Sequence, residues 1–122
     1  MNIRSDLYLM SILEIPEEIE DRGKTSYRRF LEKARKPYPA TYPTMRRWFG
    51  LHGFTTPNRE QAYGIAFSLE LSPEELNNLL TKGLLETGVQ YNDYKEIIFL
   101  YGLANHRSYE EALGMIDEFE GC

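Results

Sequence analysis

Residues 65–76 read Ile65-Ala-Phe-Ser-Leu-Glu-Leu-Ser-Pro-Glu-Glu-Leu76, and this stretch decides the fold that we expect. Ser72 followed by Glu75 three residues later is a capping box, in which each side chain bonds the other residue's backbone amide. Pro73 stands at the first helical position, where proline is well tolerated. The stretch therefore predicts that one helix ends just before Ser72 and that the next begins there.

A second pair of helices is predicted 36 residues further along the chain. Ser108 and Glu111 repeat the capping box of Ser72 and Glu75. Two copies are too few for a repeat array, so an internal duplication and a chance likeness between two helical hairpins both remain open. The helix before the second box is expected to begin at Asn92. The side chains that we expect these two helices to bury are Ile97, Ile98, Tyr101, Ala112, Ile116 and Phe119.

The first half of the chain predicts four helices, the last of which is the one that ends just before Ser72. One lies before Pro16, with Gly23 stopping the segment that follows it. Another begins at Thr25 or Ser26, and its residues Tyr27, Phe30, Leu31 and Ala34 have the spacing of a core-facing stripe. A short helix runs from the cap Thr41 to Gly50, with Met45, Trp48 and Phe49 pointing inward, and the last of the four is capped at Thr56.

No segment alternates polar and apolar residues as a strand would, so the predicted class is all-α. With 122 residues, the chain is long enough to bury one core, and we expect a single compact domain over 1–122. Within it, we expect an N-terminal helix in 1–23, a helical core in 24–83 and a C-terminal helical extension in 84–122.

Charge divides the chain more sharply than its net value of −5 suggests. Residues 22–59 hold ten Lys and Arg against Glu32 alone, a net charge of +9, whereas residues 60–122 hold three against twelve acids, a net charge of −9. A basic block of this kind is typical of a surface that binds an acidic polymer. Alternatively, these residues form a basic face that the protein's own acidic helices neutralise, and the sequence does not decide between the two.

No set of residues has the spacing of a catalytic or metal-binding motif. The acidic pairs at Glu74 and Glu110 lie in first turns of helices, where the helix dipole accounts for them. The only histidines, His52 and His106, lack further ligands at zinc spacing, and Cys122 is the single cysteine. We therefore expect no enzyme, no metal and no cofactor. No run is long enough to span a bilayer, and one terminal cysteine gives no sign of secretion, so we expect a cytoplasmic protein.

Three pieces of sequence resemble the lambda-repressor-like, or Xre-type, helix-turn-helix family. They are Met45-Arg-Arg-Trp48, Gly53-Phe-Thr-Thr-Pro57 and the stretch Ile65 to Glu75, and they occur in the family's order. The likeness covers about Thr25 to Leu80, and the later hairpin is similar to an extension that some small bacterial members carry. The linker 35–40 departs from the pattern, since it holds two prolines where the family has a compact turn with Gly.

The resemblance implies a bacterial transcription regulator that places its third helix, Thr41 to Phe49, in the major groove of double-stranded DNA. The residues expected to face bases are Thr41, Tyr42, Thr44, Arg46 and Arg47. Those expected to contact phosphates are Arg28, Arg29, Lys33, Lys36 and Arg59. The acidic C-terminal helices would hold a second copy or another protein. The alternative is a protein-interaction or adaptor module that keeps the helical scaffold and does not bind DNA.

Overall fold

The computed structural model describes residues 5–121, and these residues form helices and no strand. The prediction of an all-helical chain is confirmed. In chain order, the elements are α1 (Ser5–Ile12), α2 (Arg22–Lys33), α3 (Tyr42–Trp48), α4 (Arg59–Ser68), α5 (Pro73–Asn78), the π-helical turn η1 (Leu79–Gly83), α6 (Tyr94–Ala104) and α7 (Tyr109–Glu120). Cys122 lies outside the described residues.

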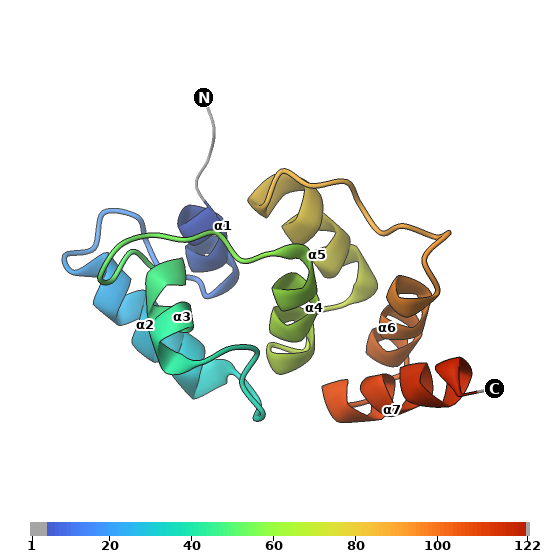
Figure 1. Ribbon diagram of the computed structural model, residues 1–122. Helices are drawn as coiled ribbons and strands as arrows, with labels where there is room; N and C mark the ends of the chain where they lie inside the picture. Colours follow the sequence, from blue (N-terminus) through green and yellow to red (C-terminus); the bar gives the residue numbers. More distant parts are fainter. Residues whose placement is uncertain (1–4, 122) are drawn as a thin grey trace.

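Helix α4 is the centre of the molecule (Figure 1). It packs against α5, η1, α6 and α7, and the seven residues from Ala62 to Ser68 are all buried. Helices α2 and α3 lie on one side of α4 and the α6–α7 hairpin on the other (Figure 1). One buried helix therefore contributes to a core that extends through both sides.

Helices α2 and α3 pack through large aromatic side chains. The ring of Phe30 on α2 lies 6.2 Å from that of Trp48, edge to face, and 5.7 Å from that of Phe49. Such pairs add to the stabilisation that burial alone provides. Met45, Trp48 and Phe49 are buried, as predicted, and Thr41 caps α3 by accepting a hydrogen bond from the Thr44 amide. The inner face of α3 is therefore occupied by the core, and its outer face is left to Tyr42 and Arg47.

The turns that end α4 and α6 have the same backbone geometry. Glu70 and His106 occupy equivalent positions 36 residues apart and have φ values of 55° and 56°. The next amide in each turn bonds back to the helix, Leu71 to Ala66 and Arg107 to Gly102, both at 2.8 Å. Capping boxes then open α5 and α7. The predicted likeness between the two hairpins thus extends to individual hydrogen bonds.

Equivalent elements of the two hairpins also contact each other reciprocally. Helix α4 packs on α7 and α5 packs on α6, in addition to the contact between α4 and α6. Tyr63 and Phe99, again 36 residues apart, stack with their ring centroids 5.0 Å apart. These reciprocal contacts are the ones expected when an approximate two-fold axis relates two similar units. Equivalent residues of the two units then meet where the axis passes between them.

Three predicted helix starts were wrong: α2 begins at Arg22, before Thr25, α4 is not capped at Thr56, and α6 is capped by Asp93 and not at Asn92. Gly23 does not stop a segment, because α2 already begins at Arg22; a Cβ on Gly23 would lie 2.8 Å from the carbonyl oxygen of Phe49, so glycine allows α3 to end close against α2. Thr56 does not cap α4. Asn58 caps it and exchanges hydrogen bonds with Gln61 in a capping box.

The predicted inner face of α6 was also wrong. The structure buries Phe99 and Leu103, while Ile97 and Tyr101 are 44% and 52% exposed. On α7, Ala112 and Ile116 are buried as predicted, but Phe119 is 57% exposed and stacks on Tyr94. Helix α6 is apolar on two faces, and periodicity alone does not show which of the two meets α4.

Candidate nucleic-acid interface and the Arg59 cluster

Four of the five residues that were expected to face bases lie on α3, and the fifth, Thr41, is its N-cap. Tyr42 is half exposed, and its ring meets that of Tyr38 in the preceding linker at 5.8 Å. The hydroxyls of Thr41 and Thr44 bond to each other at 3.0 Å as part of the helix cap. These threonines are therefore held in place by local hydrogen bonds at the start of the helix.

The two arginines of α3 have different surroundings. The Arg46 guanidinium lies over the ring of Tyr27 on α2, 6.0 Å from its centroid. Arg47 is exposed. Within residues 5–121, no carboxylate lies within ion-pair distance of either guanidinium. The positive charge of α3 is thus not neutralised by the acidic helices of the same chain.

The residues expected to contact phosphates do not form one group. Arg28 and Lys36 are exposed. Arg29 points towards α1, where it donates to the carbonyl of Leu13 at 3.4 Å, and Lys33 borders a shallow hollow on that same side. Among the described residues, none of these four has an ion-pair partner. The basic surface thus wraps around α2 and is not a single flat face.

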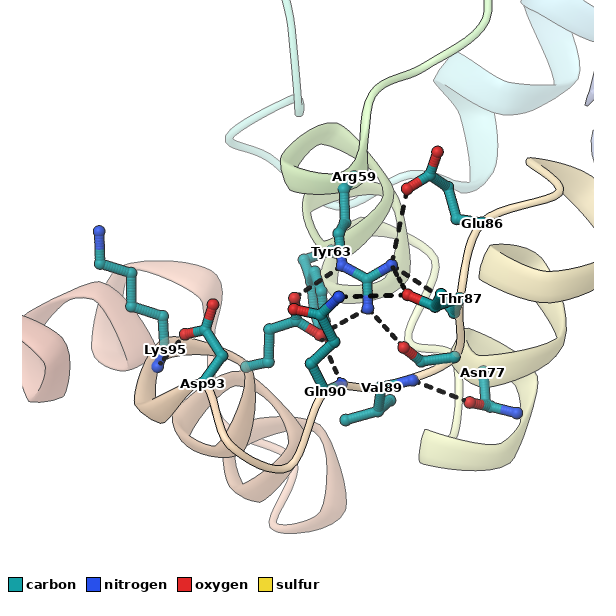
Figure 2. Close-up of polar contacts among 11 residues, drawn as sticks. Arg59, Tyr63, Asn77, Glu86, Thr87, Val89, Gln90, Asp93 and Lys95 are labelled. Carbon is teal, nitrogen blue, oxygen red and sulfur yellow. Dashed lines mark hydrogen bonds and ion pairs between the residues drawn. The ribbon is translucent and has the colours of Figure 1, made fainter.

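Arg59 lies apart from the other basic residues, in a cluster that sequence reasoning missed (Figure 2). Its Nε and Nη2 donate to the two carboxylate oxygens of Glu96 on α6 at 2.6 and 2.8 Å. Nη1 donates to the Thr87 carbonyl at 2.8 Å and Nη2 to that of Gly88 at 2.5 Å. Its side chain is only 20% exposed. Arg59 therefore joins α4, α6 and the linker between η1 and α6, and its guanidinium donors are already used within the chain.

The carboxylate of Glu96 accepts further hydrogen bonds inside this cluster. The Tyr63 hydroxyl donates to its Oε1 at 2.6 Å, and the Gln90 amide donates to the same atom at 3.0 Å. Burial by itself would raise the pKa of Glu96, but the hydrogen bonds from Arg59, Tyr63 and Gln90 outweigh it, and this pKa lies below its usual value. Burial and the bond to Glu96 raise the pKa of the Tyr63 hydroxyl. At neutral pH the cluster is therefore a true ion pair with a neutral phenol beside it.

The signal for this cluster in the sequence was weak. Arg59 and Glu96 are 37 residues apart, and Glu96 has an ordinary explanation as an acidic residue in a first helical turn, where the helix dipole favours it. A buried glutamate is uncommon unless it is paired, but nothing in the local pattern marked Glu96 as buried. The pairing follows from the way α4 and α6 cross, which only the structure shows.

Comparisons with protein-family models, curated proteins and solved structures give no match for this chain. The candidate interface is therefore described by its own geometry. Within residues 5–121, no group of His, Cys, Asp and Glu side chains is arranged to hold a metal ion. No helix in the same part of the chain is long and apolar enough to cross a membrane.

Proposed function

We propose that this protein binds double-stranded DNA as a helix-turn-helix regulator, with α2 as the supporting helix and α3 in the major groove. The single observation that supports this most is the free positive charge of Arg46 and Arg47 on a helix whose inner face is fully committed to the core. Arginine on such a helix recognises guanine edges through two parallel hydrogen bonds. Arg28 and Lys36 on flanking segments would contact phosphates.

The surroundings of α3 favour this proposal over a scaffold that has lost DNA binding. An adaptor whose basic residues served only its own stability would pair them with its acidic helices. Instead, the ion pairs formed within residues 5–121 use Arg35, Arg59, Lys95 and Arg107, and none uses α3. The remaining cations are available to an external polyanion.

Titration of the protein with random-sequence duplex DNA over a salt series tests the proposal. The affinity should fall steeply as salt rises, because each phosphate neutralised by Lys or Arg releases a condensed counterion. If the protein failed to bind duplex DNA even at low salt, the proposal would be wrong. Binding with little dependence on salt would also count against it, since contacts to phosphates could not then contribute most of the affinity.

An exposed apolar stripe on α6 favours self-association as part of this proposed function. Tyr94, Ile97, Ile98 and Tyr101 stand at i, i+3, i+4 and i+7, so they form one stripe along the helix. Ile97 and Tyr101 are well exposed, whereas Phe99 and Leu103 on the opposite face are buried. Tyr94, at one end of the stripe, stacks on Phe119 of α7, so Ile97 and Tyr101 provide the exposed apolar part of the stripe. We infer that a second copy pairs with it antiparallel about a two-fold axis, as isologous dimers do.

Replacing Ile97 by lysine should convert the dimer into a monomer, because it places a charge at the centre of the apolar contact. Sedimentation velocity over a concentration series measures the change. Leu85→Lys is the matched control, since Leu85 is 60% exposed and lies outside the α6–α7 hairpin. A wild-type protein that stays monomeric at every concentration, or a control that dissociates equally, would contradict the stripe as the interface.

A further inference from the structure

A cavity of about 340 Å³ lies where the equivalent turns of the two hairpins face one another. Its wall includes residues 67–68 and 70–73 from the first turn and residues 103–104 and 106–109 from the second. Each position in the first set has its counterpart 36 residues later in the second. The third side is residues 35–37 of the linker between α2 and α3. The cavity thus lies at the approximate two-fold axis and touches the segment that leads into α3.

The inner wall of the cavity is apolar. Phe67, Leu71 and Leu103 are each less than one-tenth exposed, so they form a fixed floor. Phe67 also holds the ring of Tyr109 edge to face at 5.5 Å. A volume near 340 Å³ is at the small end of the range for pockets that bind organic molecules. The floor therefore suits a small aromatic or branched aliphatic group.

The rim of the cavity carries an excess of positive charge. Its two carboxylates are both engaged, since Glu70 pairs with Arg35 at 2.6 Å and Glu75 accepts the Ser72 amide of its capping box at 2.9 Å. Lys36 has no ion-pair partner within the described residues. The partner of Arg107 is Glu111, which is not part of the wall. An anionic group of a ligand would meet Lys36 and the Nε and Nη2 donors of Arg107, since the pairing with Glu111 uses Nη1 at 3.3 Å.

The linker wall is tied firmly to α4. The Arg35 amide donates to the Ser68 carbonyl at 2.7 Å, and the Ser68 hydroxyl donates to the Pro37 carbonyl at 3.5 Å. A Cβ on Gly64 would lie 2.8 Å from the Cβ of Pro39, so glycine permits the linker to lie against the helix. These contacts keep the cavity open between the turns and the linker.

We propose that this cavity binds a small organic carboxylate, with its apolar body on Phe67 and Leu103 and its carboxylate at Lys36 and Arg107. Apolar walls with a few convergent polar groups are the usual design of small-molecule sites. Charge-assisted hydrogen bonds from lysine and arginine supply the specificity for an anion. This proposal stands without the proposed DNA binding, although a ligand here would touch the linker that positions α3.

Titration of the ¹⁵N-labelled full chain with benzoate, in the absence of DNA, tests the proposal by backbone amide shifts. Benzoate should give saturable shifts confined to residues 35–37, 67–73 and 103–109. Benzamide, which has the same shape without the charge, should bind more weakly. Lys36→Gln should weaken benzoate binding about tenfold, as expected for one charge-assisted contact, while Lys82→Gln, with the same charge change on η1, should leave it unchanged.

Three outcomes would overturn the carboxylate site. They are the absence of saturable shifts at these positions, equal binding of benzoate and benzamide, and equal effects of the two lysine variants. Inorganic phosphate is the further comparison, because a site that needs the apolar floor should bind benzoate more tightly than phosphate. Failure to bind DNA would leave this result unchanged, so the two proposals can fail separately.

Discussion

Replacing Arg59 by alanine is expected to lower the free energy of unfolding by about 3 kcal/mol, the lower part of the range for breaking a buried ion pair. The variant leaves the Glu96 carboxylate, which is 8% exposed, without its cationic partner. It also removes the donors to the Thr87 and Gly88 carbonyls, which hold the linker before α6. Denaturant unfolding followed by the fluorescence of Trp48, the only tryptophan, measures the loss.

Arg35→Ala is the matched control for this prediction. Arg35 and Glu70 also form an Arg–Glu contact at 2.6 Å, but their side chains are 65% and 63% exposed. An exposed pair of this kind contributes about 0.5 kcal/mol, since water already solvates both charges. Equal losses in the two variants would mean that the Arg59 cluster adds nothing through burial. Arg59→Lys should fall between the wild type and Arg59→Ala, because lysine keeps the charge and loses the planar set of donors.

Replacing Arg46 and Arg47 together by alanine is expected to weaken binding to a selected DNA site about a hundredfold or more, since each bidentate contact to guanine contributes about 1–3 kcal/mol. The stability of the fold should fall by less than about 1 kcal/mol, the scale of the Arg46 contact with the Tyr27 ring. The preferred duplex is first selected from a random pool with the wild-type protein. Fluorescence anisotropy then compares the affinities, and thermal unfolding compares the stabilities.

Lys82→Ala with Lys95→Ala is the control for the arginine variant. It removes the same charge from exposed positions on η1 and α6, outside the basic block. It should reduce affinity only slightly, through the weaker overall attraction to DNA. If both double variants lost affinity equally, α3 would have no special role in recognition. A large loss of stability in the α3 variant would instead show that its arginines hold the fold.

The sequence predicted best those features that depend on a few neighbouring residues. Both Ser-x-x-Glu capping boxes formed, and so did the cap at Thr41, because each needs only a side chain and an amide three residues away. The start of α4 was predicted at Thr56, but the capping box that opens the helix is formed by Asn58 and Gln61. Local chemistry therefore gave the number of helices and most of their ends.

Features that depend on how helices meet could not be predicted in the same way. Helix α6 carries apolar residues on two faces, and the choice of Phe99 over Ile97 as the core residue depends on the shape of α4 and α7. Glu96 is buried because Arg59 and Tyr63 come to it from α4. The cavity wall combines residues from three segments far apart in the chain. Each of these features arises from tertiary contacts, which a one-dimensional pattern does not contain.

The matching turns around the cavity have a consequence for how recognition could change over evolutionary time. Both turns share one backbone geometry, but equivalent positions hold Glu70 opposite His106 and Leu71 opposite Arg107. A ligand placed between them would meet two walls of the same shape and different polarity. Its orientation would therefore be determined by the side chains, and Arg107, which is exposed and has an ordinary backbone conformation, is the position where a substitution changes the polarity of one wall while both helical hairpins stay intact.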